Sequence, residues 1–171
     1  ITRTPRSTVG SMTEIYDYLR LLYARAGKTI SPVSGKEVKK DDVTDVVKAI
    51  DDCAAGDKIL ILVGFQKHRN RDIKEELNIL LQKGFSRVYF QEEILRIEDL
   101  LEIADIPAYF KSLDKKNNSN LFILVDRLVK KEFDEDDRHR ISDSVTTAFY
   151  EGEGELLLEI NGKKHIGFSN K

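Results

Sequence analysis

The sequence is poor in residues that cross-link or interrupt a chain: its 171 residues include one cysteine, three prolines and no tryptophan. With Cys53 alone, an internal disulfide framework is excluded, and this usage is typical of a reducing compartment, so we expect a cytoplasmic protein. No apolar run approaches the roughly 18 residues that a membrane span needs. The basic, polar start does not have the pattern of a signal peptide. We therefore expect no membrane as a partner.

The motifs of nucleotide-binding and hydrolytic enzymes are also missing from the sequence. It contains no G-x-x-x-x-G-K-[ST] phosphate loop, no G-x-S-x-G and no H-E-x-x-H. His68, His139 and His165 are far apart and stand in polar surroundings, where solvated side chains are expected. The four consecutive acids 134–137 cannot all face one ion on a helix, and the helix dipole favours acids in a first turn. We therefore expect no catalytic residue and no metal site.

Hydrophobic residues make up 40% of the chain and charged residues 34%, which is typical of a globular protein rather than a disordered one. The net charge of -2 is distributed unevenly. Residues 1–40 contain eight Lys and Arg against three acids, a balance of +5, so residues 41–171 carry -7. Such an acidic segment repels a phosphate backbone at long range, which makes nucleic acid a poor partner for residues 41–171 alone.

Hydrophobic periodicity predicts an alternation of helices and strands. Helices are expected at 12–26, from Asp41 or Asp42 to Gly56, from Ile73 to Gly84, in short pieces at 98–104 and 107–113, and at 134–150. Strands are expected at 58–65, 85–90, 121–130 and in a hairpin at 155–168. This order favours an α/β (α+β) fold with a mixed sheet, packed helices and a C-terminal β-hairpin over an Asn161-Gly162 turn.

The first 40 residues are expected to form a separate segment. Ser11 and Glu14 form an S-x-x-E capping box that starts the helix 12–26. Residues 28–40 contain Pro32 and Gly35 as breakers and are predicted to be a linker or turn. We therefore divide the chain into a helical segment with its linker, 1–40, and a domain at 41–171.

Two arginines, Arg87 and Arg127, stand in predicted strands among apolar residues. Because side chains alternate between the faces of a strand, each should share its face with apolar neighbours. These are Phe85 and Tyr89 for Arg87, and Ile123, Val125 and Val129 for Arg127. An arginine in such surroundings is a common anchor of a protein interface, and the alternative is a rim arginine that pairs with a local acid. The pattern alone leaves both interpretations open.

The stretch PRSTVGSMTEIYDYLRLLYARAG, residues 5–27, closely resembles a segment of the UvrA family, the damage-sensing subunits of the bacterial excinuclease ABC. The resemblance continues more loosely through SPVSGKEV, KILILV, LLQKGFSRV, LDKKNNSNLFILVDRLVKK and RISDSVTTAF, and so covers nearly the whole chain. UvrA proteins are DNA-binding ATPases with two ABC-type nucleotide-binding modules. The resemblance implies that residues 1–40 belong to the first module and that its phosphate loop lies outside this chain. We therefore expect no enzyme activity from this chain, while its full-length parent would be an ATPase.

The resemblance also implies a partner. Residues 41–171 are similar to the domain inserted into that module, which docks UvrB, the helicase-like protein that receives damaged DNA. Arg87 in GF-x-R and Arg127 in VDRL match the family's partner-binding arginines. We therefore expect a UvrB-like partner at these two residues, with DNA bound through the full-length parent, itself expected to be a homodimer. The alternative is a DNA-contacting module that uses the basic loop 66–71 and the basic N-terminal segment.

One departure from the family bears on cofactors. Many members read C-P-x-C-G where this chain has Ser31-Pro32-Val33-Ser34-Gly35. A serine hydroxyl is not a competent zinc ligand, so no zinc is expected at this point. We expect no cofactor in this chain, and ATP and zinc elsewhere in the full-length parent.

Overall fold

The computed structural model describes residues 29–30, 37–38, 40–66, 70–114 and 120–171. The predicted helix 12–26 and most of the linker 28–40 lie outside these ranges. The chain divides into two units, residues 1–40 and residues 41–171, and each is described by itself. Within the first unit, β1 (Thr29–Ile30) pairs antiparallel with β2 (Glu37–Val38).

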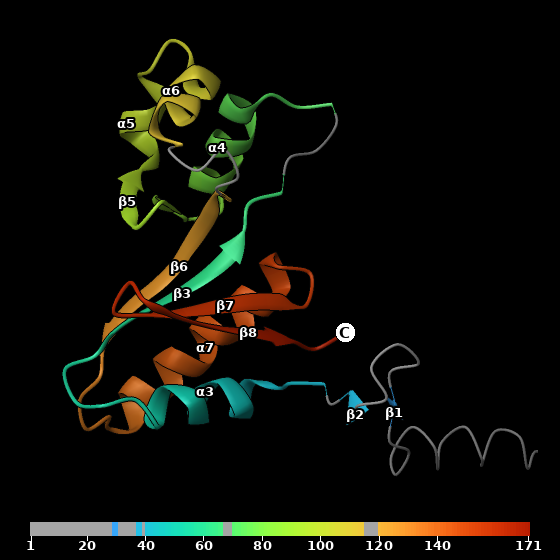
Figure 1. The fold of residues 1–171 in the computed structure, drawn as a ribbon, viewed down its shortest axis with the longest axis vertical. Helices are drawn as coiled ribbons and strands as arrows, with labels where there is room; N and C mark the ends of the chain where they lie inside the picture. Colours follow the sequence, from blue (N-terminus) through green and yellow to red (C-terminus); the bar gives the residue numbers. More distant parts are fainter. Residues whose placement is uncertain (1–28, 31–36, 39, 67–69, 115–119) are drawn as a thin grey trace, which may run out of the picture. The chain divides into compact units, whose positions relative to one another are not determined.

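The second unit contains six strands and five helices among its described residues. In chain order they are α3 (Val43–Asp51), β3 (Lys58–Gly64), α4 (Ile73–Gln82), β4 (Arg87–Phe90), β5 (Glu93–Arg96), α5 (Ile97–Leu101), α6 (Ile106–Leu113), β6 (Phe122–Val129), α7 (Glu135–Glu151), β7 (Glu155–Ile160) and β8 (Lys164–Ser169). The predicted α+β class is therefore confirmed. Figure 1 shows α3 and α7 at one end of the long strands β3 and β6, and α4, α5 and α6 grouped at the other.

The six strands form one sheet in the order β5-β4-β6-β3-β7-β8, and every neighbouring pair is antiparallel. The sequence predicted a mixed sheet, because β3, α4 and β4 follow one another as in a parallel crossover. The two strands do run in the same direction, but β6 lies between them and is antiparallel to both. The connection from β3 through α4 to β4 therefore does not place two parallel strands next to each other.

Aspartates begin three of the helices, and two of these starts, at Asp42 and in the acidic segment 134–137, were expected from the sequence. Asp42, Asp72 and Asp134 each accept a hydrogen bond from the backbone N–H three residues further on, at 2.9, 2.7 and 2.8 Å. Such caps satisfy N–H groups that have no partner inside the helix. The acids of the segment 134–137 thus form the start of α7, in agreement with their expected role.

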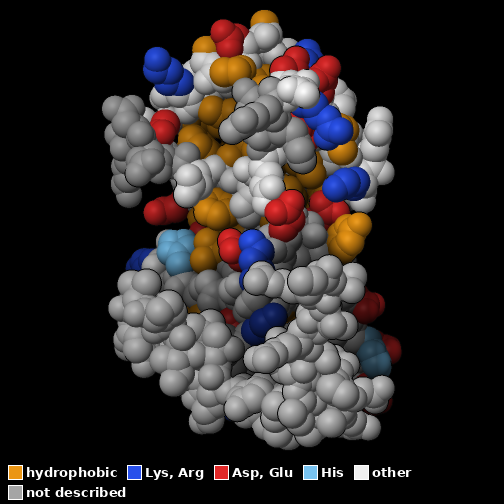
Figure 2. Space-filling model, turned by 90° about the vertical axis from the view of Figure 1, so that its right-hand side faces the viewer, with side chains coloured by type: hydrophobic (Ala, Val, Ile, Leu, Met, Phe, Trp, Pro, Cys, Tyr) orange, Lys and Arg blue, Asp and Glu red, His pale blue; other side chains and the backbone are white. Residues whose placement is uncertain are grey.

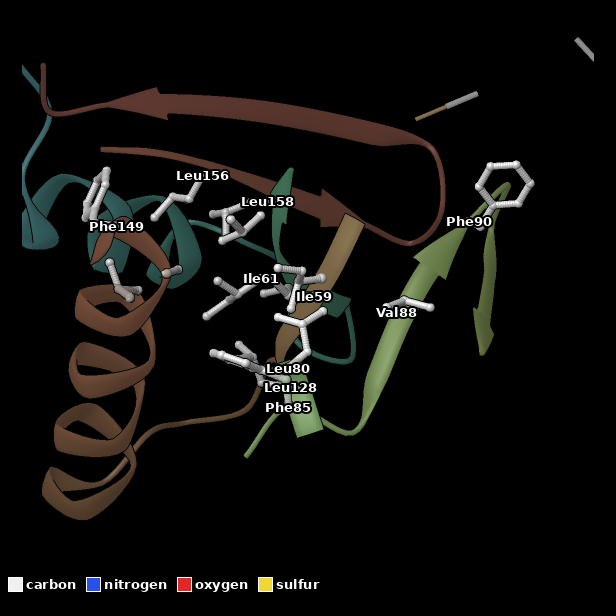
Figure 3. Close-up of a cluster of buried hydrophobic side chains, with 14 of the residues drawn as sticks. Ile59, Ile61, Leu80, Phe85, Val88, Phe90, Leu128, Phe149, Leu156 and Leu158 are labelled. Carbon is white, nitrogen blue, oxygen red and sulfur yellow. The ribbon is translucent and has the colours of Figure 1, made fainter. Parts of the chain in front are cut away.

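The core lies between one face of the sheet and the helices. Alternate residues of β3, Ile59 and Ile61, are fully buried there, and Leu158 of β7 joins them. Figure 3 shows these side chains together, with Phe149 of α7 beside Leu156. Burial of such side chains contributes roughly 1.5–3 kcal/mol each. The run 58–65 is therefore a central strand, as predicted.

The stretch 92–113 differs from its prediction in one element. Its two short helices are present as α5 and α6, but residues 93–96 form strand β5, which was not expected. β5 pairs with β4 through a two-residue turn in which Gln91 and Glu92 both have positive φ. The predicted C-terminal hairpin is confirmed: Asn161 and Gly162 have positive φ, and the N–H of Lys163 bonds to the carbonyl of Ile160.

Candidate protein-interaction surface

The second face of the sheet, called the outer face below, carries its own small apolar cluster. Its members are Leu60, Leu62, Tyr89, Leu124, Phe122 and Leu157. All six belong to strands, and no residue of the described helices is part of the cluster. Within the described residues, the outer face thus carries an apolar cluster from strands β3, β4, β6 and β7, in which Leu60, Leu62, Tyr89 and Leu124 are 8% exposed or less.

Arg87 is the first residue of β4, and its side chain belongs to the outer face. Val88 is fully buried in the main core, so the alternation of the strand places Arg87 and Tyr89 on the other side. The predicted neighbour Tyr89 is therefore correct. Phe85 is not such a neighbour: it precedes the strand, which begins only at Arg87, and it packs in the main core.

Arg127 also lies on the outer face, but for a different reason from the one predicted. It stands opposite Leu60 of β3, a member of the outer cluster. Between Asp126 and Leu124 the register shifts, so that Val125 has no opposite residue in β3. This bulge reverses the alternation, as an extra residue in a strand does. Ile123 and Val125 therefore pack toward the main core, and their predicted place beside Arg127 was wrong.

Both arginines line one shallow groove of about 220 Å³ between the start of β4 and strand β6. β4 and β6 are paired only at Val88 with Ile123 and at Tyr89 with Phe122. Beyond these pairs the two strands separate, which leaves the space. The structure thus brings together two residues that are 40 positions apart in the sequence.

The two arginines differ from the other arginines of the described chain in their partners. The others each form an ion pair: Arg71 with Glu76, Arg96 with Glu98, Arg138 with Asp51 and Arg140 with Asp126. Within the described residues, Arg87 and Arg127 form none, and both are exposed. Their charges are therefore available to a carboxylate from outside this chain.

Asp126, next to Arg127, anchors this part of β6. Its carboxylate accepts the N–H of Arg127 at 2.7 Å, two bonds from Arg140 at 2.8 and 3.0 Å, and one from the hydroxyl of Ser144 at 2.8 Å. Arg140 and Ser144 belong to α7, so the carboxylate links the bulged strand to the helical layer. Asp126 was not among the residues predicted from the sequence, although an acid within an apolar strand is a visible signal.

A buried polar group lies at the other end of the outer face. Glu159 of β7 is only 3% exposed, and its carboxylate lies 3.2 Å from the imidazole of His165. Burial raises the pKa of Tyr89 well above its ordinary range, and the nearby Glu159 carboxylate raises it further. His165 is exposed, as expected for a solvated side chain, and its imidazole also partners this carboxylate.

A second groove of about 600 Å³ runs along the outer face next to the first. Arg127 lines both grooves. Apolar side chains contribute to this second groove from four strands, β3, β4, β5 and β6. Two of them, Ile94 and Val129, are exposed. Val129 was predicted to share a face with Arg127, and it does line this groove with Arg127. Ile94 was not singled out from the sequence, since β5 itself was not predicted.

Two other features, a metal-binding cluster and a membrane-spanning helix, are absent from the part of the chain that the structure describes. No group of three or more His, Cys, Asp or Glu is arranged there to hold a metal ion. In the same residues, no helix is both long and apolar enough to cross a membrane.

Fold and surface together define an α+β module with an apolar cluster on the outer sheet face and two arginines that form no ion pair with any described residue. Residues 42–162 match the family described as the UvrA interaction domain. Proteins named UvrABC system protein A are similar over most of the chain: 36% identity over 158 residues in Rickettsia conorii and 39% over 154 residues in Methanothermobacter thermautotrophicus, or 92% and 90% of this chain. The chain belongs to the UvrA family. It spans about 15% of the length of these relatives.

Proposed function

We propose that residues 41–171 form the module through which a UvrA-family protein of nucleotide excision repair docks a UvrB-like partner. Arg87 and Arg127 are the central contacts in this proposal. The observation that carries it is that these two arginines, which have no ion pair among the described residues, border one groove on the outer face. The name of the matching family, an interaction domain, agrees with a role in binding another protein.

The chemistry of the surface supports a protein partner with carboxylates. A guanidinium stays charged and can hold a carboxylate by two parallel hydrogen bonds. Arginine beside aromatic and aliphatic side chains is the composition in which interface energy concentrates. Tyr89 and Leu124 provide such surroundings next to the two arginines.

The alternative of a DNA-contacting module has less support. Residues 41–171 carry a net charge of -7, and a duplex would be repelled at long range. On the side of the molecule seen in Figure 2, basic and acidic side chains are interspersed rather than gathered by sign. Residues 67–69 of the basic loop lie outside the described ranges.

The test is a pair of binding titrations with the 171-residue chain, one against purified UvrB and one against duplex DNA, each at several salt concentrations. The proposal expects saturable binding to UvrB with modest dependence on salt, and weak binding to DNA. Binding through phosphates would instead weaken steeply as salt rises. Tight, strongly salt-dependent binding to DNA with no binding to UvrB would overturn the proposal in favour of the DNA-contacting module.

A further inference from the structure

We propose that the second groove of the outer face seats an apolar side chain of the partner, beside a partner carboxylate that pairs with Arg127. This inference rests on the proposed docking of a UvrB-like protein and specifies the chemistry of the docked segment. It adds Ile94 and Val129 to the two arginines as contact residues. The segment would carry an aliphatic or aromatic residue next to an acidic one.

The distribution of exposed apolar side chains carries the inference. Among the described residues, the large hydrophobic side chains that are exposed are Ile94 at 37%, Val129 at 53% and Tyr150 at 80%. A single exposed apolar residue needs no explanation. Here, however, Ile94 and Val129 line the same groove although they belong to different strands, β5 and β6.

The groove is built to receive an apolar group. Leu60 and Tyr89 line it together with Ile94 and Val129, and both are nearly fully buried. A pocket of this kind, with a few polar groups at its border, is typical of sites that hold an anchoring side chain. Because Arg127 lines this groove and the arginine groove alike, one partner segment can occupy both.

The charges around the groove set the place of the acidic residue. Lys58 stands opposite Val129, and Arg127 stands opposite Leu60, so both cations lie on the β3–β6 side of the outer face. Glu92 lies in the turn before β5, on the other side, and Glu159 is already partnered by His165. A partner carboxylate is therefore attracted toward Arg127 and repelled by Glu92. Because the cations and Glu92 lie on different sides of the groove, the partner segment should bind in a single orientation.

Two substitutions test the apolar contact, Ile94→Thr and Val129→Thr. Threonine keeps the β-branched shape suited to a strand but adds a hydroxyl that loses its hydration when the groove is filled. We expect each variant to bind UvrB at least about fivefold more weakly. The melting temperature should be unchanged for Val129→Thr, whose side chain is 53% exposed, and should fall only slightly for Ile94→Thr, whose side chain is 37% exposed. The matched control is Tyr150→Thr, which removes an exposed apolar side chain from α7, outside this groove, and should bind like the parent chain.

The outcomes separate this inference from the function on which it rests. If Arg127→Ala loses binding while both threonine variants bind like the parent, the groove is not a contact and only the docking proposal survives. If the parent chain does not bind UvrB, the proposed function itself fails. If Tyr150→Thr loses as much as the groove variants, the apolar effect is not specific to the groove and the inference is overturned. As an independent measurement, the methyl groups of Ile94 and Val129 should receive saturation transfer from bound UvrB, and its absence would contradict the proposal.

Discussion

The carboxylate of Asp126 accepts a hydrogen bond from the backbone N–H of its neighbour Arg127 at 2.7 Å. Because successive residues of a strand alternate between faces, the two side chains nevertheless point to opposite faces of the sheet. Since the N–H of Arg127 donates to this side chain, the carboxylate fixes the backbone at the point where the guanidinium leaves the strand. Arg140 and Ser144 hold the same carboxylate from α7. The helical layer thus supports the position of a residue on the outer face.

From this linkage we predict that Asp126→Ala destabilises the domain by about 1–3 kcal/mol, because several donors lose their acceptor at once. The melting temperature should fall by several degrees in a thermal scan. Binding to UvrB should also weaken at temperatures where the variant is fully folded, since Arg127 loses its fixed position. The control is Asp143→Ala, which removes an exposed carboxylate of α7. Equal melting temperatures of both variants would show that the Asp126 contacts do not stabilise the fold.

For the two arginines we predict that Arg87→Ala or Arg127→Ala weakens binding to UvrB by at least about tenfold, or about 1.4 kcal/mol. Most of the loss should appear as faster dissociation, as is usual for contacts inside an interface. Arg87→Glu should bind more weakly still, because it places like charges together. The melting temperatures should barely change, since neither side chain has an ion pair within the described residues.

Kinetic binding measurements decide this prediction, with Arg138→Ala as the control. That variant removes the same charge from α7, where the arginine pairs with Asp51. It should leave the dissociation rate unchanged. If the two groove variants bind like the parent, the interface lies elsewhere. If Arg127→Ala strongly lowers the melting temperature, Arg127 has a structural role and only Arg87 remains as a contact.

Local chemistry explains which elements were predictable from the sequence. Acidic starts marked α3 and α7, helical periodicity marked α4, and the Asn161-Gly162 pair marked the last hairpin. The turn before β5 carries no such signal, because Gln91 and Glu92 take the positive φ angles that glycine or asparagine usually takes. Strand β5 therefore has no local signal in the sequence, and it lies in a stretch whose pattern favours short helices.

The two arginines of the candidate surface could be predicted from the sequence, but the strand arrangement that brings them together could not. Alternation along β4 placed Arg87 correctly beside Tyr89. In β6 the same rule failed for Ile123 and Val125, because the extra residue of a bulge shifts the alternation and leaves no mark in composition. The insertion of β6 between β3 and β4 is likewise a long-range arrangement, and it produces both the antiparallel sheet and the groove between the arginines.

We predict that the purified chain carries no zinc. The sequence holds one cysteine and three histidines, at most four side chains of the kinds that usually bind zinc. Tetrahedral zinc sites need about four cysteine or histidine ligands that converge. Elemental analysis should give far less than one zinc per chain, both for the parent and for a Cys53→Ser variant. About one zinc per parent chain that remains bound after dialysis would contradict the prediction and show that side chains of this chain do converge on a zinc ion.

We also predict that the chain neither binds nor hydrolyses ATP. It contains no glycine-rich loop whose amides and lysine could hold the phosphates. Calorimetric titration with Mg-ATP should show no heat of binding. The matched experiment uses a longer UvrA-family protein that includes a phosphate loop, which should bind under the same conditions. A micromolar affinity of the 171-residue chain would contradict the prediction.

The last prediction concerns acid stability and rests on Asp51 at the end of α3. Partial burial raises the pKa of Asp51, but hydrogen bonds from Lys130 at 3.0 Å and Arg138 at 2.8 Å outweigh it and hold the pKa below its ordinary value of 3.8. The native carboxylate then binds a proton less readily than the unfolded one. Its contribution to stability is complete above pH 3.8 and is lost as the pH falls through the lower native pKa. The free energy of unfolding, measured by denaturant titration, should therefore fall more steeply below pH 3.8 in the parent than in Asp51→Asn. The control Asp52→Asn removes a neighbouring exposed carboxylate with no ion pair among the described residues, and its curve should keep the parent's slope. Parallel curves for the parent and Asp51→Asn would show that the contacts with Lys130 and Arg138 do not favour the ionised carboxylate.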